Sequence, residues 1–186
     1  MTDCREKLLE LLETSGRRLH ALLYRLTLRA DAAEELLQEL MLRLLQSSGF
    51  ARAESAEGYA VRAAVNLAFD WRRIRRGKVK CNDVAGAELG DSSVDALSRI
   101  EQSEQSERLL ASLDTLSAAQ RDVVVLHSLE EETFEQIGRR LHRTPHQVRA
   151  LCHKGLQRLR RIHRDSTIAP STAIDMVLDE VRHEPK

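Results

Sequence analysis

Apolar residues recur every three or four positions along much of the chain, which is the spacing of amphipathic α-helices. This pattern predicts a helix over 7–28, with Gly16 as a candidate break, and a second helix over 32–46. Asp31 is the expected N-cap of the second helix, because Glu34 follows in the capping-box position. The expected apolar face of this helix consists of Leu36, Leu37, Leu40, Met41, Leu44 and Leu45, and its polar face begins with Glu34, Glu35, Gln38 and Glu39.

A small and polar stretch at 47–58 predicts a loop, in which Phe50 is expected to be exposed. The segment that follows, YAVRAAVNLAFDWRRIRR (59–76), predicts one long helix. The side chains expected to pack inward are Ala60, Ala64, Leu67 and Trp71. Polar side chains recur at spacings of three and four, which puts them together on another face: Arg62, Asn66, Asp70, Arg73 and Arg76.

Helical spacing fades over 77–98, a stretch that holds three of the eight glycines and predicts a flexible acidic linker. Helical spacing resumes over RIEQSEQSERLLASLDTL (99–116), and the three helices expected after it each begin with a capping signal. The pairs are Ser117 with Gln120, Thr133 with Gln136, and Thr144 with Pro145 at the first helical position.

The composition favours the all-α class, because Leu and Ala dominate the apolar residues while Gly (8) and Pro (3) are scarce. We expect two small helical domains joined by a flexible acidic linker. The expected boundaries are 1–78 for the first domain, 79–108 for the linker, 109–164 for the second domain and 165–186 for an extension with one short helix. Three sparse cysteines and the lack of a long apolar window predict a soluble, cytoplasmic protein.

Charge is segregated along the chain although its formal net charge is zero. Residues 17–80 carry a net charge of +6, residues 81–115 a net charge of −6, and residues 116–164 a net charge of +5. Two basic blocks separated by an acidic one suggest a polyanionic partner. A solvated surface would explain either basic block taken alone.

The stretch IGRRLHRTPHQVRALCHKG (137–155) predicts a helix-turn-helix, in which the second helix is capped and rich in basic and amide side chains. Such groups bond to base edges in the major groove of DNA. The candidate DNA contacts are Thr144, His146, Gln147, Arg149, Ala150, His153 and Lys154. Arg139, Arg140, Arg143, Arg158 and Arg160 are candidates for phosphate contacts on either side. A packed three-helix unit with a solvated basic face is the plain alternative.

A metal site is a second interpretation of the same stretch, because His142, His146, Cys152 and His153 lie close together in sequence. The predicted turn separates His142 from His146, so helical spacing does not apply to this pair. Cys152 is expected to face inward, and no second cysteine or carboxylate completes a tetrahedral set. A hydrolase site is weaker still, because scattered Ser, His and Asp residues show no nucleophile elbow. We expect no cofactor and no enzymatic activity.

Three segments, in this order and spacing, resemble the bacterial RNA polymerase sigma factors of the extracytoplasmic-function type. They are AAEELLQELMLRLLQ, YAVRAAVNLAFDWRRIRR and LDTLSAAQRDVVVLHSLEEETFEQIGRRLHRTPHQVRALCHKGLQRLRR. Several matched blocks in order are more specific than any single motif. The resemblance implies a protein that binds core RNA polymerase and recognises the minus-ten and minus-thirty-five elements of promoter DNA. An anti-sigma factor is a further candidate partner, whereas a membrane is not.

The resemblance also implies roles for individual residues. Glu34, Glu35, Gln38 and Glu39 occupy the positions that dock on the clamp helices of the largest polymerase subunit. Arg62, Asn66, Asp70, Arg73 and Arg76, with Phe50 in the preceding loop, correspond to the part that holds the melted minus-ten strand. Phe50, Tyr59 and Trp71 are candidates for stacking on unpaired bases. Core packing is the alternative for Tyr59 and Trp71, and a structural hydrogen bond with a neighbouring arginine is the alternative for Asn66 and Asp70.

Two other classes of function remain open at this point. A dimeric helix-turn-helix repressor would use the N-terminal helices as a sensor or dimerisation domain. It leaves the arginine-rich face of the 59–76 helix unexplained. A pure protein-interaction module would lack salt-dependent binding to nucleic acid.

Overall fold

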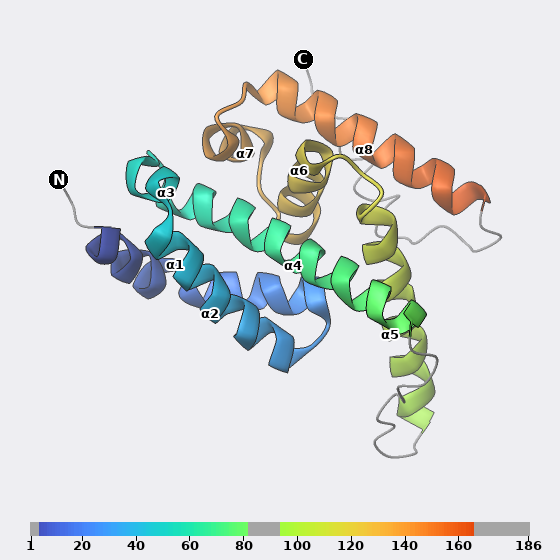
Figure 1. Ribbon diagram of the computed structural model, residues 1–186. Helices are drawn as coiled ribbons and strands as arrows, with labels where there is room; N and C mark the ends of the chain where they lie inside the picture. The colour runs from blue at the N-terminus through green and yellow to red at the C-terminus, as the bar shows by residue number, and fades with distance from the viewer. Residues whose placement is uncertain (1–3, 82–93, 166–186) are drawn as a thin grey trace. The chain divides into compact units, whose positions relative to one another are not determined.

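The computed structural model describes the backbone of residues 4–81 and 94–165 and the side chains of residues 4–77 and 104–162. These ranges hold eight helices (Figure 1): α1 Cys4–Thr27, α2 Ala30–Gln46, α3 Ser48–Arg52, α4 Ala56–Cys81, α5 Val94–Leu113, α6 Ala118–Leu129, α7 Phe134–Leu141 and α8 Pro145–Asp165. Every element of the described ranges is helical, which confirms the all-α prediction. None of these helices has the length and apolarity that crossing a membrane requires. The helix expected near the C-terminus falls outside the described residues.

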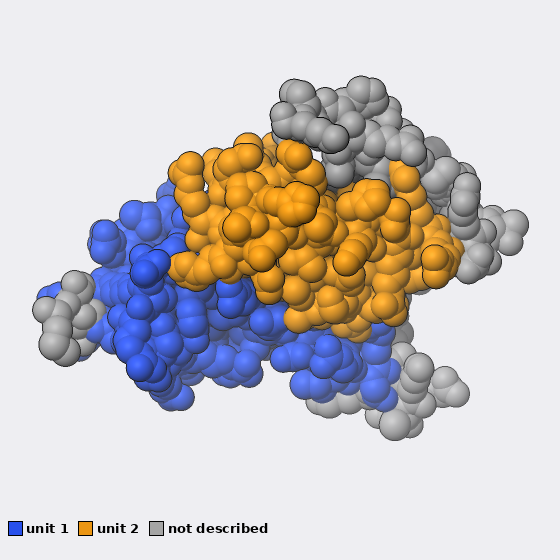
Figure 2. All heavy atoms as spheres, turned by 90° about the horizontal axis from the view of Figure 1, so that it is seen from above, with its two compact units in different colours: residues 1–111 blue, residues 112–186 orange. Residues whose placement is uncertain are grey.

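The chain forms two compact units, residues 1–111 and 112–186 (Figure 2). In the first unit, α1 packs on both α2 and α4, and α2 packs on α4. Leucines of α1 and α2 fill much of this core, and α4 contributes both small alanines and the larger side chains Val61, Val65, Leu67 and Phe69. The fully or almost fully buried residues include Leu19, Leu22, Leu23, Leu26, Leu36, Leu40, Leu44, Ala60, Ala64 and Ala68. Helix α1 runs through Gly16 without interruption, so the candidate break there was wrong.

The turn between α1 and α2 differs from the prediction. Leu28 adopts a left-handed conformation with φ 58°, and α2 begins at Ala30. Arg29 is the N-cap and makes no side-chain cap bond, so the assignment of Asp31 as N-cap was wrong. Asp31 instead lies in the first turn, where the Arg29 side chain donates to its carboxylate and lowers the pKa of that group to about 2. A negative charge at this end of the helix also interacts favourably with the helix dipole.

The stretch predicted as a loop at 47–58 contains the short helix α3. Ser47 caps it by accepting a hydrogen bond from the Phe50 backbone nitrogen, and the Ser47 hydroxyl lies 2.8 Å from that of Tyr59. Phe50 is completely buried, with the Lys7 ammonium 5.5 Å from its ring centroid and the Tyr59 ring centroid at 6.0 Å. The expectation that Phe50 is exposed was therefore wrong, because α3 turns this ring into the space between α1 and α4, both of which α3 contacts.

Four arginines lie close together in α4: Arg72, Arg73, Arg75 and Arg76. Arg72 alone among them is almost fully buried, with 4% of its surface exposed. One guanidinium nitrogen donates to the Leu26 carbonyl at 3.3 Å, near the end of α1. Another forms an ion pair with Glu107 of α5 at 2.6 Å. Helix α5 begins at Val94, inside the predicted flexible stretch 77–98, and continues through 99–113, where helical spacing was predicted to resume. Residues 82–93 lie outside the described residues.

In the second unit, α8 packs on α6 and α7. The predicted N-caps Ser117 and Thr133 are confirmed, each in a complete capping box with Gln120 and Gln136. Thr144 has the same geometry, because its hydroxyl accepts from the Gln147 backbone nitrogen and its own nitrogen donates to the Gln147 side chain. The buried apolar residues of this unit include Val123, Val124, Leu126, Phe134, Ile137, Leu141, Val148, Cys152, Leu156 and Leu159.

The turn between α7 and α8 requires a glycine in α7. His142 ends α7 in a left-handed conformation, with φ 52° and ψ 49°. The Arg143 nitrogen then donates to the Gly138 carbonyl at 2.8 Å. This brings the returning backbone so close that a Cβ on Gly138 would lie 2.7 Å from the Arg143 oxygen. The angle between α7 and α8 therefore depends on the absence of a side chain at Gly138.

Substitution Gly138→Ala should destabilise the second unit. Helix propensity alone would favour alanine by about 1 kcal/mol, but the contact is with backbone, which has little room to shift. We expect a net loss of about 1–2 kcal/mol, as for other overpacked sites. Urea unfolding followed by circular dichroism measures it. Gly16→Ala is the matched control, because its Cβ would meet Leu12 at an ordinary 3.8 Å, so it should be neutral or stabilising. Equal stability of Gly138→Ala and wild type would contradict the argument.

Candidate nucleic-acid interface

Helix α4 carries a polar strip on its solvent side. Arg62, Asp70 and Arg73 are exposed, while Asn66 and Arg76 are half-buried. Their spacing of three and four residues keeps them on one side of the helix, as the sequence predicted. Within the strip, an Arg73 guanidinium nitrogen lies 3.2 Å from an Asp70 carboxylate oxygen. Such an exposed pair contributes little to stability, so Arg73 can exchange this partner for a phosphate at low cost.

The aromatic candidates do not lie on this strip. Trp71 is half-buried on another side of α4, and the Arg75 guanidinium lies 5.3 Å from its ring centroid. Tyr59 is half-buried, with its hydroxyl beside that of Ser47. Phe50 is enclosed in the core and has no surface for a base to contact. The structure therefore does not bring the three rings together as one stacking surface.

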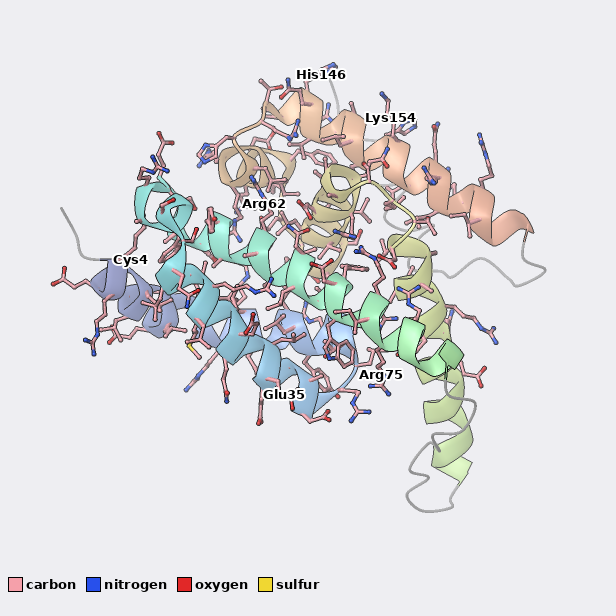
Figure 3. The ribbon with its side chains drawn as sticks, in the orientation of Figure 1. Cys4, Glu35, Arg62, Arg75, His146 and Lys154 are labelled. Atoms are coloured by element: carbon pink, nitrogen blue, oxygen red, sulfur yellow. The ribbon has the colours of Figure 1, made fainter. Side chains whose placement is uncertain are left out.

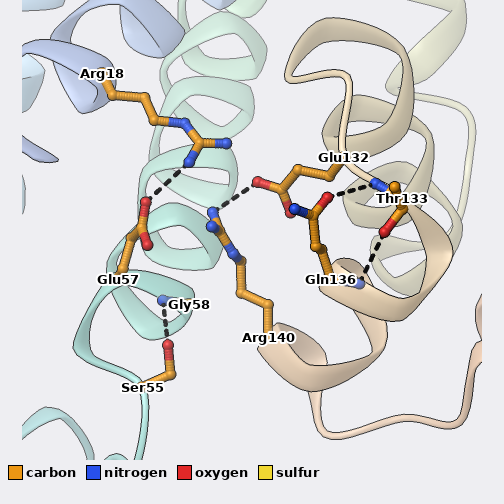
Figure 4. A network of polar contacts seen from close by, with 8 residues as sticks. All are labelled: Arg18, Ser55, Glu57, Gly58, Glu132, Thr133, Gln136 and Arg140. Carbon is orange, nitrogen blue, oxygen red and sulfur yellow. Dashed lines mark hydrogen bonds and ion pairs between the residues drawn. The ribbon is translucent and has the colours of Figure 1, made fainter.

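The start of α4 is held by polar contacts of its own (Figure 4). The Ser55 hydroxyl accepts a hydrogen bond from the Gly58 nitrogen at 3.0 Å, which caps the helix. An Arg18 guanidinium nitrogen on α1 lies 2.9 Å from a Glu57 carboxylate oxygen in the first turn. The ion pair helps to set the position of α4 relative to α1, whereas the cap determines where α4 begins.

Helix α2 presents a second polar strip. Glu34, Glu35 and Gln38 are exposed, and Glu35 points away from the ribbon in Figure 3. The Glu39 side chain is 45% exposed and pairs with Arg43 at 2.7 Å. Leu42 and Leu45 are exposed at 55% and 44% and continue the same side of the helix. Leu45 was predicted to share one apolar face with Leu40 and Leu44, which are buried, but it lies on the exposed side, and Leu42 was not predicted there.

The second unit carries its polar strip on α8. Thr144, His146, Gln147, Ala150, His153 and Lys154 are exposed, and the His146 and Lys154 side chains extend away from the helix in Figure 3. Gln157, which was not among the predicted DNA contacts, lies on the same side, and its amide nitrogen is 3.4 Å from a His153 ring nitrogen. Buried Val148, Cys152, Leu156 and Leu159 form the opposite side.

Arg149 lies at the edge of this strip and is half-buried. Its guanidinium carbon is 5.4 Å from the ring centroid of Phe134, the first residue of α7. The Phe134 ring in turn stacks on the His127 ring of α6, with centroids 4.6 Å apart and planes 27° apart. Three helices thus meet around this arginine.

The arginines proposed to hold phosphates differ in their surroundings. Arg139, Arg143 and Arg158 are exposed, and Arg160 is half-buried. An Arg140 guanidinium nitrogen lies 2.7 Å from a carboxylate oxygen of Glu132, whose side chain is only 5% exposed (Figure 4). Arg140 therefore stabilises the segment before α7, and we remove it from the candidate phosphate contacts.

The described residues offer no cluster of three His, Cys, Asp or Glu side chains that would hold a metal ion. His142 ends α7, and its left-handed backbone conformation forms part of the turn to α8. Cys152 is fully buried, and burial raises the pKa of its thiol from 9.0 to about 12. Cysteine binds a metal ion as the thiolate, so the raised pKa and the burial of Cys152 argue against the metal interpretation at this residue.

Burial of Cys152 should also make the stability of the second unit depend on pH. The thiol ionises in the unfolded chain near pH 9 but stays protonated in the folded unit. Its contribution is complete below pH 9 and is lost as the pH rises toward 12, by at most about 1.4 kcal/mol per pH unit. Urea unfolding between pH 8 and 10.5 should show a steeper decline for wild type than for Cys152→Ala. Parallel declines would show that the thiol is not responsible.

Family models match both units: that of Sigma-70 region 2 matches residues 11–78, and that of Sigma-70, region 4 matches residues 112–161. The ECF RNA polymerase sigma factor SigE of Mycolicibacterium smegmatis is 31% identical over 155 residues, 81% of this chain, which spans 59% of that protein's length. The RNA polymerase sigma-E factor of Streptomyces avermitilis is 32% identical over 129 residues, 69% of either protein. A co-crystal structure of the sigma factor RpoE with the anti-sigma factor NepR from Bartonella quintana is similar at a TM-score of 0.46 and 18% identity. The match covers 89% of this chain and 99% of that one.

Proposed function

This chain belongs to the sigma-70 family of RNA polymerase sigma factors, of the extracytoplasmic-function type, and we propose that it directs promoter-specific initiation of transcription. In this proposal it binds core RNA polymerase in the cytoplasm and recognises the minus-ten and minus-thirty-five elements of a promoter. It acts by binding and positioning, and the polymerase carries out the chemistry.

The observation that supports this proposal best is the presence of two different polar strips on the first unit. The α2 strip is acidic, and the α4 strip is rich in arginine; both consist mainly of exposed side chains. An acidic surface repels DNA and suits a basic protein surface, whereas an arginine-rich one suits phosphates. A helical unit that only dimerises explains neither strip.

We assign the α2 strip to core polymerase. Glu34, Glu35, Gln38 and Glu39 supply its polar part, and Leu42 and Leu45 continue it with exposed apolar surface. Protein interfaces commonly combine an apolar centre with a charged rim. The pair of exposed leucines beside the carboxylates fits that arrangement and gives the α2 strip an apolar contact as well as a charged one.

We assign the α4 strip to the melted minus-ten strand. Arg62 and Arg73 are exposed and can neutralise phosphates, and the side-chain amide of Asn66 can both donate to and accept from a base edge. Asp70 can accept from a base amino group once Arg73 turns to a phosphate. Arg76, half-buried at one end, extends the strip. Phe50 is withdrawn from this assignment because it is buried.

We assign the α8 strip to the minus-thirty-five element in duplex DNA. A recognition helix contacts bases mainly with its N-terminal residues, and Thr144, His146, Gln147, Arg149 and Ala150 occupy that end of α8. In this structure the Gln147 side chain completes the cap with Thr144. Its amide nitrogen, which this cap bond does not use, is the donor that we assign to DNA. His153 and Lys154 extend the contact by one turn.

Run-off transcription with core polymerase tests the proposal directly. Promoters are first selected from a random library with the reconstituted holoenzyme, and transcripts are then measured with and without this protein. We expect transcription that depends on the protein and on two separated sequence elements. Tight binding to a duplex site without polymerase, with no effect on initiation, would favour the repressor alternative instead.

Charge reversal on the α2 strip should abolish binding to core polymerase while the fold stays intact. Glu35→Lys/Glu39→Lys removes two exposed carboxylates, and the Glu39–Arg43 pair that is lost contributes only about 0.3–0.5 kcal/mol. Native gel shifts or interferometry with core polymerase measure the affinity. Glu10→Lys/Glu13→Lys is the matched control, since it makes the same charge change at exposed positions of α1. Equal binding by both double variants would remove the α2 strip from the interface.

A further inference from the structure

The surroundings of Arg149 set it apart from the other basic residues of α8. The α8 strip is otherwise exposed, and Lys154 in particular extends into solvent (Figure 3). Arg149 instead lies half-buried with its guanidinium carbon 5.4 Å from the centroid of the Phe134 ring. This is within the range of a cation–π contact. Arg149 therefore has a preferred position before any DNA arrives.

The Phe134 ring is itself held firmly. Only 3% of Phe134 is exposed, and the residue directly follows the N-cap Thr133 of α7. Its ring stacks on His127, whose Nδ1 atom lies 3.0 Å from the Glu132 carbonyl oxygen. The Glu132 carboxylate in turn pairs with Arg140 of α7. The ring that meets Arg149 is thus fixed by contacts to α6 and to the segment before α7.

A guanidinium group that lies over an aromatic ring uses its face for that contact. Its N–H groups point outward in the plane of the group and can still donate to another partner. An arginine free in solvent must give up rotamer freedom when it binds, and this lowers its affinity. An arginine that is already placed over a ring loses less.

We propose that Phe134, supported by His127, is a positioning residue that holds Arg149 ready to donate to a guanine of the minus-thirty-five element. Guanine is the expected base because its O6 and N7 atoms accept two hydrogen bonds from one guanidinium. This inference rests on the proposed function and adds to it the residue that recognises one base, Arg149, and the ring that orients it, Phe134. Phe134 itself makes no contact with DNA and acts through Arg149.

The test uses holoenzyme and a promoter library randomised only in the minus-thirty-five element. Arg149→Ala should lose the preference for guanine at one position by on the order of 10- to 100-fold. Phe134→Leu keeps an apolar side chain but removes the ring face, and should lose roughly 3- to 10-fold at that same position. The double variant should be no worse than Arg149→Ala, because Phe134 has no effect once the arginine is absent.

Ile137→Val is the control for a general loss of packing in α7, because Ile137 is fully buried and has no aromatic ring that could hold a guanidinium. It should leave the preference at every position unchanged. A Phe134→Leu effect spread evenly over all positions, or additive with Arg149→Ala, would overturn the positioning role. A guanine preference that survives Arg149→Ala would overturn the assignment of the arginine. If wild-type protein supports no initiation at all, the proposed function fails first, and that outcome is distinct from the other two.

Discussion

The packing of leucines from α1 and α2 against the apolar side of α4, which includes fully buried Phe69, determines the orientation of each helix in the first unit. Ala60, Ala64 and Ala68 of α4 are completely buried, and α4 packs on both neighbours. Each buried leucine contributes about 1.5–3 kcal/mol, so rotating any of these helices about its axis would be costly. Once one side of a helix is buried, helical geometry fixes which residues face solvent. The α2 and α4 strips are consequences of this core.

A backbone constraint has the same effect in the second unit. The close approach of the Arg143 oxygen to Gly138, with His142 in a left-handed conformation, sets how α8 leaves α7. The Thr144–Gln147 capping box then starts α8 at a defined residue. Together these contacts determine which side of α8 packs on α6 and α7, and hence which side carries the candidate DNA contacts.

Features that depend on a few neighbouring residues could be predicted from the sequence. The N-caps Ser117, Thr133 and Thr144 of the second unit were predicted correctly, because a cap is a local interaction between residues three apart. The partners Gln120 and Gln136 were also predicted, whereas the Gln147 partner of Thr144 was not. Features that depend on tertiary contacts could not. Phe50 is buried because α3 directs its ring toward α1 and α4, and Asp31 lost its predicted role to Arg29. In the run LLQELMLRLL, apolar residues outnumber those that one side of a helix can bury, so Leu42 and Leu45 became exposed.

The arginines illustrate why net charge along a sequence is an uncertain guide to a DNA-binding surface. Arg72, Arg73 and Arg75 have different surroundings because they lie on different sides of α4. Arg72 is buried and contacts Leu26 and Glu107, Arg73 belongs to the exposed strip, and Arg75 lies beside the Trp71 ring. The second unit makes a similar division, because Arg121 is buried near Asp114 and Arg140 pairs with Glu132, whereas Arg139, Arg143 and Arg158 are exposed. A buried arginine that lost its partner would be strongly destabilising, whereas an exposed one can exchange a water shell for phosphate. Positive charge is therefore available to DNA only where the fold leaves the guanidinium at least partly exposed. Half-buried Arg149 meets this condition while lying beside the Phe134 ring, much as Arg75 lies beside Trp71.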